Sequence, residues 1–173
     1  MNTQKCFRTA TSKNWVWNVT KTLIQTAFFW GFFLIFLPDL ILYVTGNSTV
    51  LTFSPLPNLG VFAFAIFSIL GLSSGIMMSV IGQGTPLPND CPNKLVVKGA
   101  YRFVRNPLAV AGIGQGISVG LYFGSLAVII YALSGAVLWH YLVRPAEEVD
   151  LEKRFGAEYL GYKRRVKCWL PRF

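Results

Sequence analysis

The stretch LAVAGIGQGISVGLYFGSLAVIIYALSGAVLWHYL, residues 108–142, contains no charged side chain. As one continuous helix it would be about 52 Å long at 1.5 Å per residue, whereas the hydrocarbon core of a bilayer is only about 30 Å thick. Gly120 and Gly124 mark a turn near its middle. The stretch therefore predicts a tight hairpin of two membrane-spanning helices.

Charged residues flank this hairpin and are almost absent from the other apolar stretches. They fall into three net-basic segments, residues 5–21, 90–105 and 144–172, with Asp39 as the exception. Because lysine and arginine prefer the cytoplasmic side, the chain must cross the bilayer an even number of times between these segments. We therefore expect an all-α polytopic membrane protein with four transmembrane helices in two hairpins and both termini in the cytoplasm, in a bacterial inner membrane.

The same pattern sets boundaries within a single membrane domain. We expect a cytoplasmic N-terminal segment at 1–21, a first hairpin at 22–81, a cytoplasmic loop at 82–107, a second hairpin at 108–142, and a cytoplasmic C-terminal segment with an amphipathic helix at 143–173.

The composition agrees with a membrane protein. Of 173 residues, 53% are hydrophobic, the mean hydropathy is +0.49 and the net charge is +9, which is too apolar for an ordinary soluble domain. Nucleic acid is an unsuitable partner, since the basic residues flank spans instead of lining one soluble face. Cys6, Cys91 and Cys168 are scattered, so we expect neither disulfides nor a metal site.

Two features inside the spans allow either a structural or a functional interpretation. Asp39 follows Pro38, and it lies either near the outer surface or at membrane depth, where an acid is usually functional. Gly112, Gly116 and Gly120 recur every four residues, a spacing that lets a partner helix or a ligand approach the backbone.

The C-terminal segment carries one apolar stripe. Its members recur every three or four residues, as on one face of a helix: Leu151, Phe155, Tyr159 and Tyr162. Such a helix either lies on the inner leaflet or folds back over the bundle as a lid.

Polar residues gather at the cytoplasmic mouth of the second hairpin. His140, Arg144, Glu147 and Glu148 fall at i, i+4, i+7 and i+8, so one helix face can carry all four. In a tight hairpin they lie close to Arg105. The alternative is a solvated charge run stabilised by pairs along the helix.

Two motifs carry a family resemblance. Residues 82–88 (GQGTPLP) and 95–107 (LVVKGAYRFVRNP), followed by 147–162 (EEVDLEKRFGAEYLGY) and 169–171 (WLP), resemble the integral-membrane methyltransferases grouped with isoprenylcysteine carboxyl methyltransferase and the phospholipid N-methyltransferases. The resemblance covers about half the chain. It implies an all-helical enzyme that uses S-adenosylmethionine at the cytoplasmic membrane face and takes a lipid-like or prenylcysteine-like acceptor from the bilayer.

Carried onto this chain, the resemblance implies a set of site residues. The cofactor-binding set is Val96, Val97, Gly99, Tyr101, Arg105, Asn106, Pro107, Gly112, His140, Glu147 and Glu148. Arg105, Arg144 and Glu148 are the candidates for catalysis. An arginine would orient a carboxylate acceptor, and Glu148 or His140 would deprotonate an amine.

The chain departs from the family pattern at two positions. Asn106 stands where the family has histidine, and it can form hydrogen bonds but cannot act as a base. Ala109 stands where tyrosine is frequent, so an aromatic wall is missing and the acceptor stays open: prenylcysteine, phospholipid amine, quinone-like lipid or small apolar thiol.

Two other functions are compatible with this sequence. A sterol-type membrane reductase would use NADPH, and the cluster at 163–165 (KRR) could bind its 2′-phosphate. A non-catalytic membrane scaffold would use the basic tail to bind anionic lipid.

Overall fold

The computed structural model describes residues 8–11, 14–46 and 48–169, and their regular secondary structure is entirely helical. The α-helices are α1 (Trp15–Phe29), α2 (Leu37–Thr45), α3 (Pro57–Val80), α4 (Pro107–Phe123), α5 (Leu126–Leu138) and α6 (Arg144–Arg165). Two π-helical segments are η2 (Trp30–Phe36) and η6 (Trp139–Val143), and three short 3-10 turns are η3 (Thr49–Leu51), η4 (Pro88–Asp90) and η5 (Gly99–Arg102). The expected all-helical class is confirmed.

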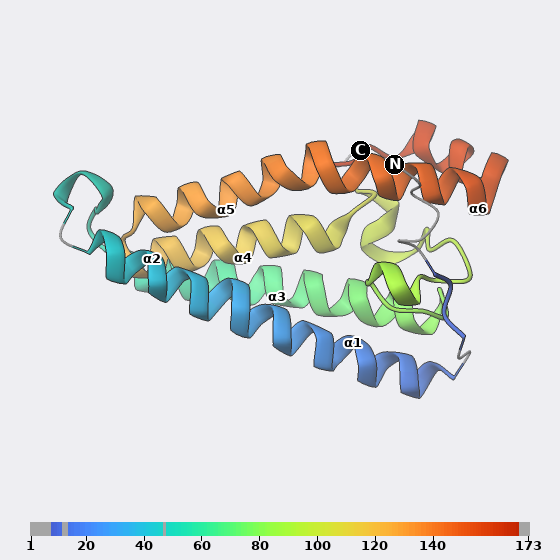
Figure 1. The fold of residues 1–173 in the computed structure, drawn as a ribbon, viewed down its shortest axis with the longest axis horizontal. Coiled ribbons are helices and arrows are strands. Elements are labelled where there is room, and N and C mark those ends of the chain that lie inside the picture. Colours follow the sequence, from blue (N-terminus) through green and yellow to red (C-terminus); the bar gives the residue numbers. More distant parts are fainter. Residues whose placement is uncertain (1–7, 12–13, 47, 170–173) are drawn as a thin grey trace.

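The long helices form an elongated bundle, and the connections that carry charged residues in the described part of the chain lie at one end. In Figure 1 the loop between α3 and α4, the segment that precedes α1, and α6 lie together at the right-hand end, while the turns between α2 and α3 and between α4 and α5 lie at the opposite end. The three basic segments of the sequence therefore meet at the same end of the bundle, as the charge pattern predicted.

The first helix is longer than expected and runs unbroken through α1, η2 and α2. Asn14 begins it, because its side-chain oxygen accepts the backbone N–H of Val16 at 3.0 Å, an N-cap that satisfies one free donor of the first turn. The helix therefore starts at Trp15 instead of near residue 22. Pro38 lies inside the helix, and Asp39 is exposed in the first turn of α2.

A π-helical segment adapts the backbone to Pro38. In π-geometry the carbonyl of Phe33 would accept from residue 38, but proline has no N–H, and the N–H of Leu37 goes to Phe32. The hydroxyl of Tyr131 on α5 donates to the Phe33 carbonyl at 3.1 Å. Because Pro38 has no N–H, the Phe33 carbonyl is free to accept from Tyr131, and this hydrogen bond connects η2 to α5.

Helix α4 is the centre of the bundle and packs closely on α3 and α5. A Cβ at Gly60 would lie 2.8 Å from the backbone nitrogen of Tyr122, and one at Gly116 would lie 2.8 Å from the Cβ of Ala132. Small residues therefore permit backbone approach, as is usual in membrane bundles. Gly124, with φ 67°, ends α4, and Ser125 caps α5 by accepting from Val128.

Three helical segments are long and apolar enough to cross a bilayer: Trp15–Thr45, Pro57–Val80 and Leu126–Arg165. Helix α4, at 17 residues, is apolar but shorter, so these lengths do not confirm the expected count of four crossings. Large side chains on the outside of the bundle are exposed, Phe28 at 70% and Ile69 at 69%, as expected for surfaces that meet lipid. Beyond Val143 the chain becomes charged, and we treat α6 as lying outside the hydrocarbon.

Helix α6 folds back over the loop between α3 and α4 instead of lying free. Gly156 has a left-handed backbone (φ 49°, ψ −124°) and breaks the helix. Beyond the break Tyr159 and Tyr162 are buried, and the hydroxyl of Tyr162 donates to the carbonyl of Tyr101 at 2.7 Å. The apolar stripe therefore forms a cover, one of the two arrangements that the sequence allowed.

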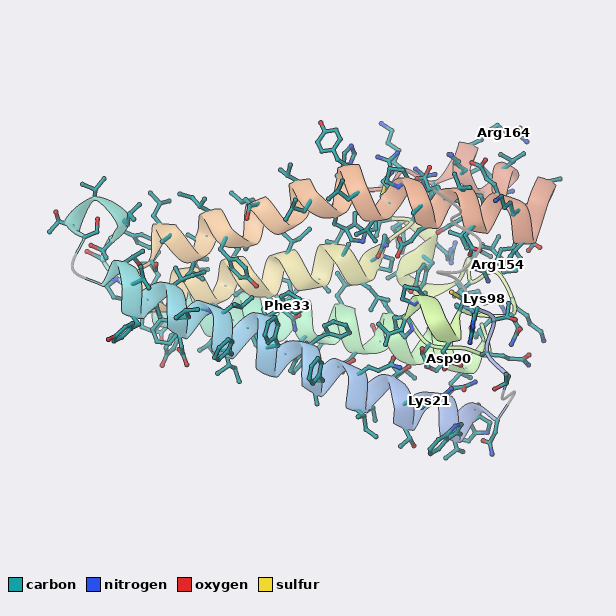
Figure 2. The ribbon with its side chains drawn as sticks, in the orientation of Figure 1. Lys21, Phe33, Asp90, Lys98, Arg154 and Arg164 are labelled. Atoms are coloured by element: carbon teal, nitrogen blue, oxygen red, sulfur yellow. The ribbon has the colours of Figure 1, made fainter. Side chains whose placement is uncertain are left out.

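The segment that precedes α1 is also fixed to this loop. The backbone N–H of Ala10 donates to Cys91 at 2.9 Å, and that of Cys91 donates to Arg8 at 2.7 Å. Lys21 forms an ion pair with Asp90, and the two side chains point toward each other between α1 and the loop in Figure 2.

Candidate functional site

A cavity of about 260 Å³ lies at the polar end of the bundle, between the loop that precedes α4 and the cover formed by α6. The loop contributes Val96, Tyr101 and Arg105 to its wall, and α6 contributes Glu147 and Tyr159. We call it the polar cavity, because titratable side chains reach it from both sides.

Arg105 lines this cavity together with two other cationic residues, Lys94 and Arg154. Its backbone N–H donates to the carbonyl of Lys167 at 3.0 Å, which fixes it against the C-terminal segment. Its Nη2 lies 3.1 Å from Oε1 of Glu148, and only 11% of the side chain is exposed. Its Nε and Nη1 are buried without a hydrogen-bond partner in the described part of the chain. Unpaired buried guanidinium donors are costly, so Nε and Nη1 of Arg105 can each donate a charge-assisted hydrogen bond to an anionic ligand.

Glu148 holds three cations together behind the cavity. Besides Arg105, it accepts from Nε of Arg144 at 2.9 Å and from Nζ of Lys163 at 2.8 Å. Burial alone would raise the pKa of Glu148, but the hydrogen bonds from Lys163 and Arg144 and the charge of Arg105 outweigh it and lower that pKa. Glu148 is therefore ionised at neutral pH, and its carboxylate holds Arg105 in position.

Glu147 lines the polar cavity, as does a second acid, Asp150. The side chain of Asn106 caps α4 by accepting from the N–H of Ala109 at 3.0 Å, and its amide donates to Oε2 of Glu147 at 3.3 Å. Burial raises the pKa of Glu147 to about 7, and the neighbouring charge of Glu148 adds to the shift. A carboxyl group in this range can take up or release a proton near neutral pH.

His140 lies outside the cavity, against the C-terminal segment. The indole N–H of Trp169 donates to Nδ1 of His140 at 2.8 Å, and the two rings stack with centroids 5.9 Å apart. Since an indole nitrogen can only donate, Nδ1 carries no proton in this arrangement. Nη1 of Arg144 is 3.2 Å from the same ring atom. His140 therefore holds Arg144 and Trp169 together beside the polar cavity.

A second cavity of about 530 Å³ lies beside the first, inside the apolar part of the bundle. Side chains from α1, η2, α3, α4, α5 and η6 surround it. The two cavities share four wall residues, Pro86, Leu108, Ala109 and Trp139. We call the second one the apolar cavity.

The structure distributes the residues predicted for the site over three places. Val96, Tyr101, Arg105, Asn106 and Glu147 line the polar cavity. Arg144, His140 and Glu148 form the network behind it. Gly112 lines the apolar cavity, and a Cβ there would meet nothing within 4 Å.

Three further predicted residues, Val97, Gly99 and Pro107, line neither cavity and take no part in the network behind the polar one. Val97 is exposed at 36%. Gly99 serves a turn, with φ +58° and the side chain of Met77 close to where its Cβ would be. Pro107 is buried as the first residue of α4. The motif at 95–107 thus also shapes the loop, and only part of it contacts the cavity.

Sequence reasoning missed the contribution of α6 beyond Glu148. Asp150, Leu151, Arg154 and Phe155 also line the polar cavity, and Nη1 of Arg154 donates to the carbonyl of Pro92 at 2.7 Å. The apolar spacing of the stripe was visible, but its contact with the loop depends on the break at Gly156. Leu170 and Pro171 of the final motif lie outside the described residues.

A comparison with family models adds an independent observation. The model for phospholipid methyltransferases matches residues 57–158, more than half of the 173-residue chain. The chain belongs to the phospholipid methyltransferase family. A comparison with curated proteins gave no significant match.

The phospholipid methyltransferase match covers most, but not all, of the two cavities. It spans α3, the loop, α4, α5 and α6 as far as Glu158, and therefore includes Arg105, Asn106 and Glu147. It leaves out α1 and η2, which form one wall of the apolar cavity. Family membership identifies a membrane methyltransferase, and the wall formed by α1 and η2 lies outside the matched residues.

Proposed function

We propose that this protein transfers a methyl group from S-adenosylmethionine to a lipid-like acceptor at the polar end of the bundle. The observation that carries the proposal is the buried Arg105, whose Nε and Nη1 have no partner among the described residues while the residue lines a cavity beside an apolar one. Family membership supports the reaction class.

The residues around the polar cavity fit the functional groups of S-adenosylmethionine. Arg105 offers two donors for its carboxylate, and Glu147 offers an acceptor for its amino group or ribose hydroxyls. The hydroxyl of Tyr101 is buried without a partner in the described part of the chain. Phe155 and Tyr159 supply aromatic surface for a purine ring. S-adenosylmethionine, when bound, supplies a methyl group whose leaving group is the sulfonium sulfur.

The protein's task in such a reaction is alignment and exclusion of water. Holding two reactants in line replaces an encounter in solution by a nearly unimolecular step. Glu148 fixes Arg105, and α6 covers the cavity through the bond from Tyr162 to Tyr101. Asn106 fixes Glu147 relative to the start of α4. These contacts place a binding arginine and an acid on opposite walls of one cavity.

For the membrane arrangement we propose four crossings, with α4 as a short span and the polar end in the cytoplasm. Helix α4 has 17 residues, about 25 Å of helix, and α3 and α5 flank it. The basic segments meet at the end that carries the polar cavity (Figure 1). The positive-inside rule then places that end in the cytoplasm.

The reductase alternative receives less support. Of the basic cluster at 163–165, Lys163 is already paired with Glu148 and Glu152, and Arg164 and Arg165 are exposed. A dinucleotide is larger than S-adenosylmethionine, so a polar cavity of about 260 Å³ suits it less well.

A labelling assay tests this proposal. Purified protein in detergent is incubated with S-adenosylmethionine carrying a labelled methyl group and with lipid extract from the host. We expect label in the lipid fraction, and binding of S-adenosylmethionine but not of NADPH by calorimetry. Binding of NADPH alone would favour the reductase. Binding of neither, without label in the lipid, would favour the scaffold.

A further inference from the structure

The polar and apolar cavities meet along one short stretch of wall. Four residues line both of them: Pro86, Leu108, Ala109 and Trp139. With S-adenosylmethionine in the polar cavity and the acceptor entering through the apolar one, the methyl group has to pass beside this shared wall, because donor and acceptor atoms must lie in line and in contact. The residues of the shared wall would therefore face the reacting methyl group.

The shared wall contains no charged side chain, although the group that it would face is charged. The methyl group of S-adenosylmethionine is bound to a sulfonium sulfur, which carries a positive charge, and burying a charge without a partner is strongly unfavourable. Proline, leucine and alanine offer only apolar surface. Among aromatic side chains, the face of an indole ring is the best partner for a cation. Of the four shared residues, Trp139 is the one that can provide it.

The two acids of the polar cavity do not remove the need for such a partner. Asp150 is already paired with Arg154, whose Nε donates to Oδ2 of the acid at 2.6 Å. Glu147 accepts from the amide of Asn106, and with its pKa raised to about 7 it is only partly ionised near neutral pH. A sulfonium at the junction of the cavities would thus gain from an aromatic face beside it.

The other aromatic side chains around the two cavities are placed differently. Phe155 and three tyrosines line only the polar cavity, whereas Trp30, Tyr131 and two phenylalanines line only the apolar one. The ring of Phe155 already has a cation over it, since Cζ of Arg154 lies 5.0 Å from the ring centroid. Among the described residues, Trp139 is therefore the aromatic side chain that the two cavities share.

The position of Trp139 is fixed by its helix and by the C-terminal segment. It is the first residue of η6, and its carbonyl accepts from the N–H of Arg144 in the wide turn of a π-helix, a geometry that is frequent at functional sites. The rings of Trp139 and Trp169 pack edge to face with centroids 5.2 Å apart. Trp169 is itself held by its hydrogen bond to His140. The indole ring of Trp139 is thus held in place before any ligand binds.

Resting on the proposed methyl transfer, we propose that the indole ring of Trp139 binds the sulfonium of S-adenosylmethionine by a cation–π contact at the junction of the two cavities. The product S-adenosylhomocysteine is a neutral thioether at the same atom, so it makes no such contact. Trp139 therefore distinguishes the methyl donor from the spent cofactor, and it favours exchange of the product for a new donor molecule after each transfer.

The test compares the affinities of the charged donor and the neutral product. Both are titrated by calorimetry into wild type, Trp139→Leu, Trp139→Phe and Trp30→Leu in detergent. Leucine keeps apolar surface but has no aromatic face, whereas phenylalanine has a weaker one than tryptophan. Trp30 lines only the apolar cavity, so Trp30→Leu is the matched control for the loss of a cavity tryptophan. Melting temperatures check that each variant is folded.

We expect the ratio of the affinity for S-adenosylmethionine to that for S-adenosylhomocysteine to fall about three- to thirtyfold in Trp139→Leu. It should fall by a smaller factor in Trp139→Phe and keep the wild-type value in Trp30→Leu. An unchanged ratio in Trp139→Leu, whether both ligands bind as before or both bind more weakly, would overturn the inference, as would the same fall in Trp30→Leu.

Two further outcomes are decided by the same titrations. If Trp139→Leu does not fold, Trp139→Phe takes its place, and a wild-type ratio in Trp139→Phe overturns the inference. Failure of wild type to bind S-adenosylmethionine would instead overturn the proposed function.

Discussion

Nη2 of Arg105 lies 3.1 Å from Oε1 of Glu148, while its other two guanidinium nitrogens are buried without a partner in the described residues. Nη2 of the arginine is thus held by the protein, while Nε and Nη1 have no partner among the described residues. Glu148 also pairs with Arg144 and Lys163, so one carboxylate connects the loop to both halves of α6. The position of the binding arginine depends on this acid.

Glu148→Gln should destabilise the protein in detergent. It removes the charge that three cations share, and loss of one partner from a partly buried pair costs about 1–3 kcal/mol. The folded-state pKa of Glu148 is lowered, so its stabilising effect is present above the ordinary carboxylate range. The difference in melting temperature from wild type should therefore be seen at pH 7 and shrink as the pH falls below about 4.

Glu158→Gln is the control for this substitution. Glu158 is exposed on the same helix, whereas Glu152 is paired with Lys163 and would be a less neutral choice. Equal melting temperatures for Glu148→Gln and Glu158→Gln at pH 7 would show that the three pairs are solvated and contribute nothing.

Glu147→Gln should have the opposite effect on stability. Burial and the charge of Glu148 raise the folded-state pKa of Glu147 to about 7, while Asn106 partly offsets them and Asp150 adds a little. A raised pKa means that ionisation costs folding free energy above the ordinary carboxylate range, and the full cost is reached above about pH 7. At pH 8 the free energy of unfolding of the variant should exceed that of wild type by on the order of 1–3 kcal/mol, so the variant should have the higher melting temperature. At pH 4 the two proteins should melt at the same temperature. A lower melting temperature at pH 8 would contradict the assignment.

The rate of methyl transfer should depend on the ionisation of the same residue. We expect Glu147 to take up the proton of the acceptor, and since only its carboxylate form can do so, kcat/KM should rise as the pH passes through about 7. In Glu147→Gln the rate should fall about 10²- to 10⁴-fold. A variant that keeps both the rate and the pH profile of wild type would exclude Glu147 as proton acceptor.

Membrane sidedness can be tested with two engineered cysteines at opposite ends of the bundle. Val50 is 81% exposed in the turn between α2 and α3, and Lys98 is exposed in the loop at the polar end. Val50→Cys should react with an impermeant maleimide added outside intact cells, and Lys98→Cys only after lysis. Cys91 and Cys168 are buried, so their protection alone would not report the side. The reverse labelling pattern would invert the proposed orientation.

The end of the bundle that carries the candidate site could be predicted from the sequence. Most of the contacts within the candidate site could not. Runs of uncharged residues and basic flanks reflect the cost of charge in lipid, which acts on each residue separately. The expected packing of the glycine stripe holds at Gly116, which lies against Ala132, but Gly112 borders a cavity. Spacing alone gives a shared face and not the shape of the neighbouring helix.

The two adjacent acids show the same limit. Helical spacing grouped His140, Arg144, Glu147 and Glu148, yet Glu148 pairs with Arg105 and Lys163 while Glu147 reaches Asn106. Neighbouring side chains on a helix diverge by about 100°, and the π-helical η6 changes the register before α6 begins. The break at Gly156 brings Lys163 back to Glu148. It requires a positive φ, which glycine can adopt but which a glycine in the sequence does not by itself predict.

The most direct measurement is calorimetric titration of S-adenosylmethionine into three proteins in detergent: wild type, Arg105→Lys and Arg164→Lys. Lysine at 105 keeps a positive charge beside Glu148 but loses the two unpaired donors, whereas Arg164 is exposed on α6 and points away from the bundle (Figure 2). Wild type and Arg164→Lys should bind equally. Arg105→Lys should bind about ten- to a hundredfold more weakly, since lost charge-assisted hydrogen bonds cost about 1.5–3 kcal/mol. Equal affinity of all three proteins, or no binding by wild type, would contradict the account.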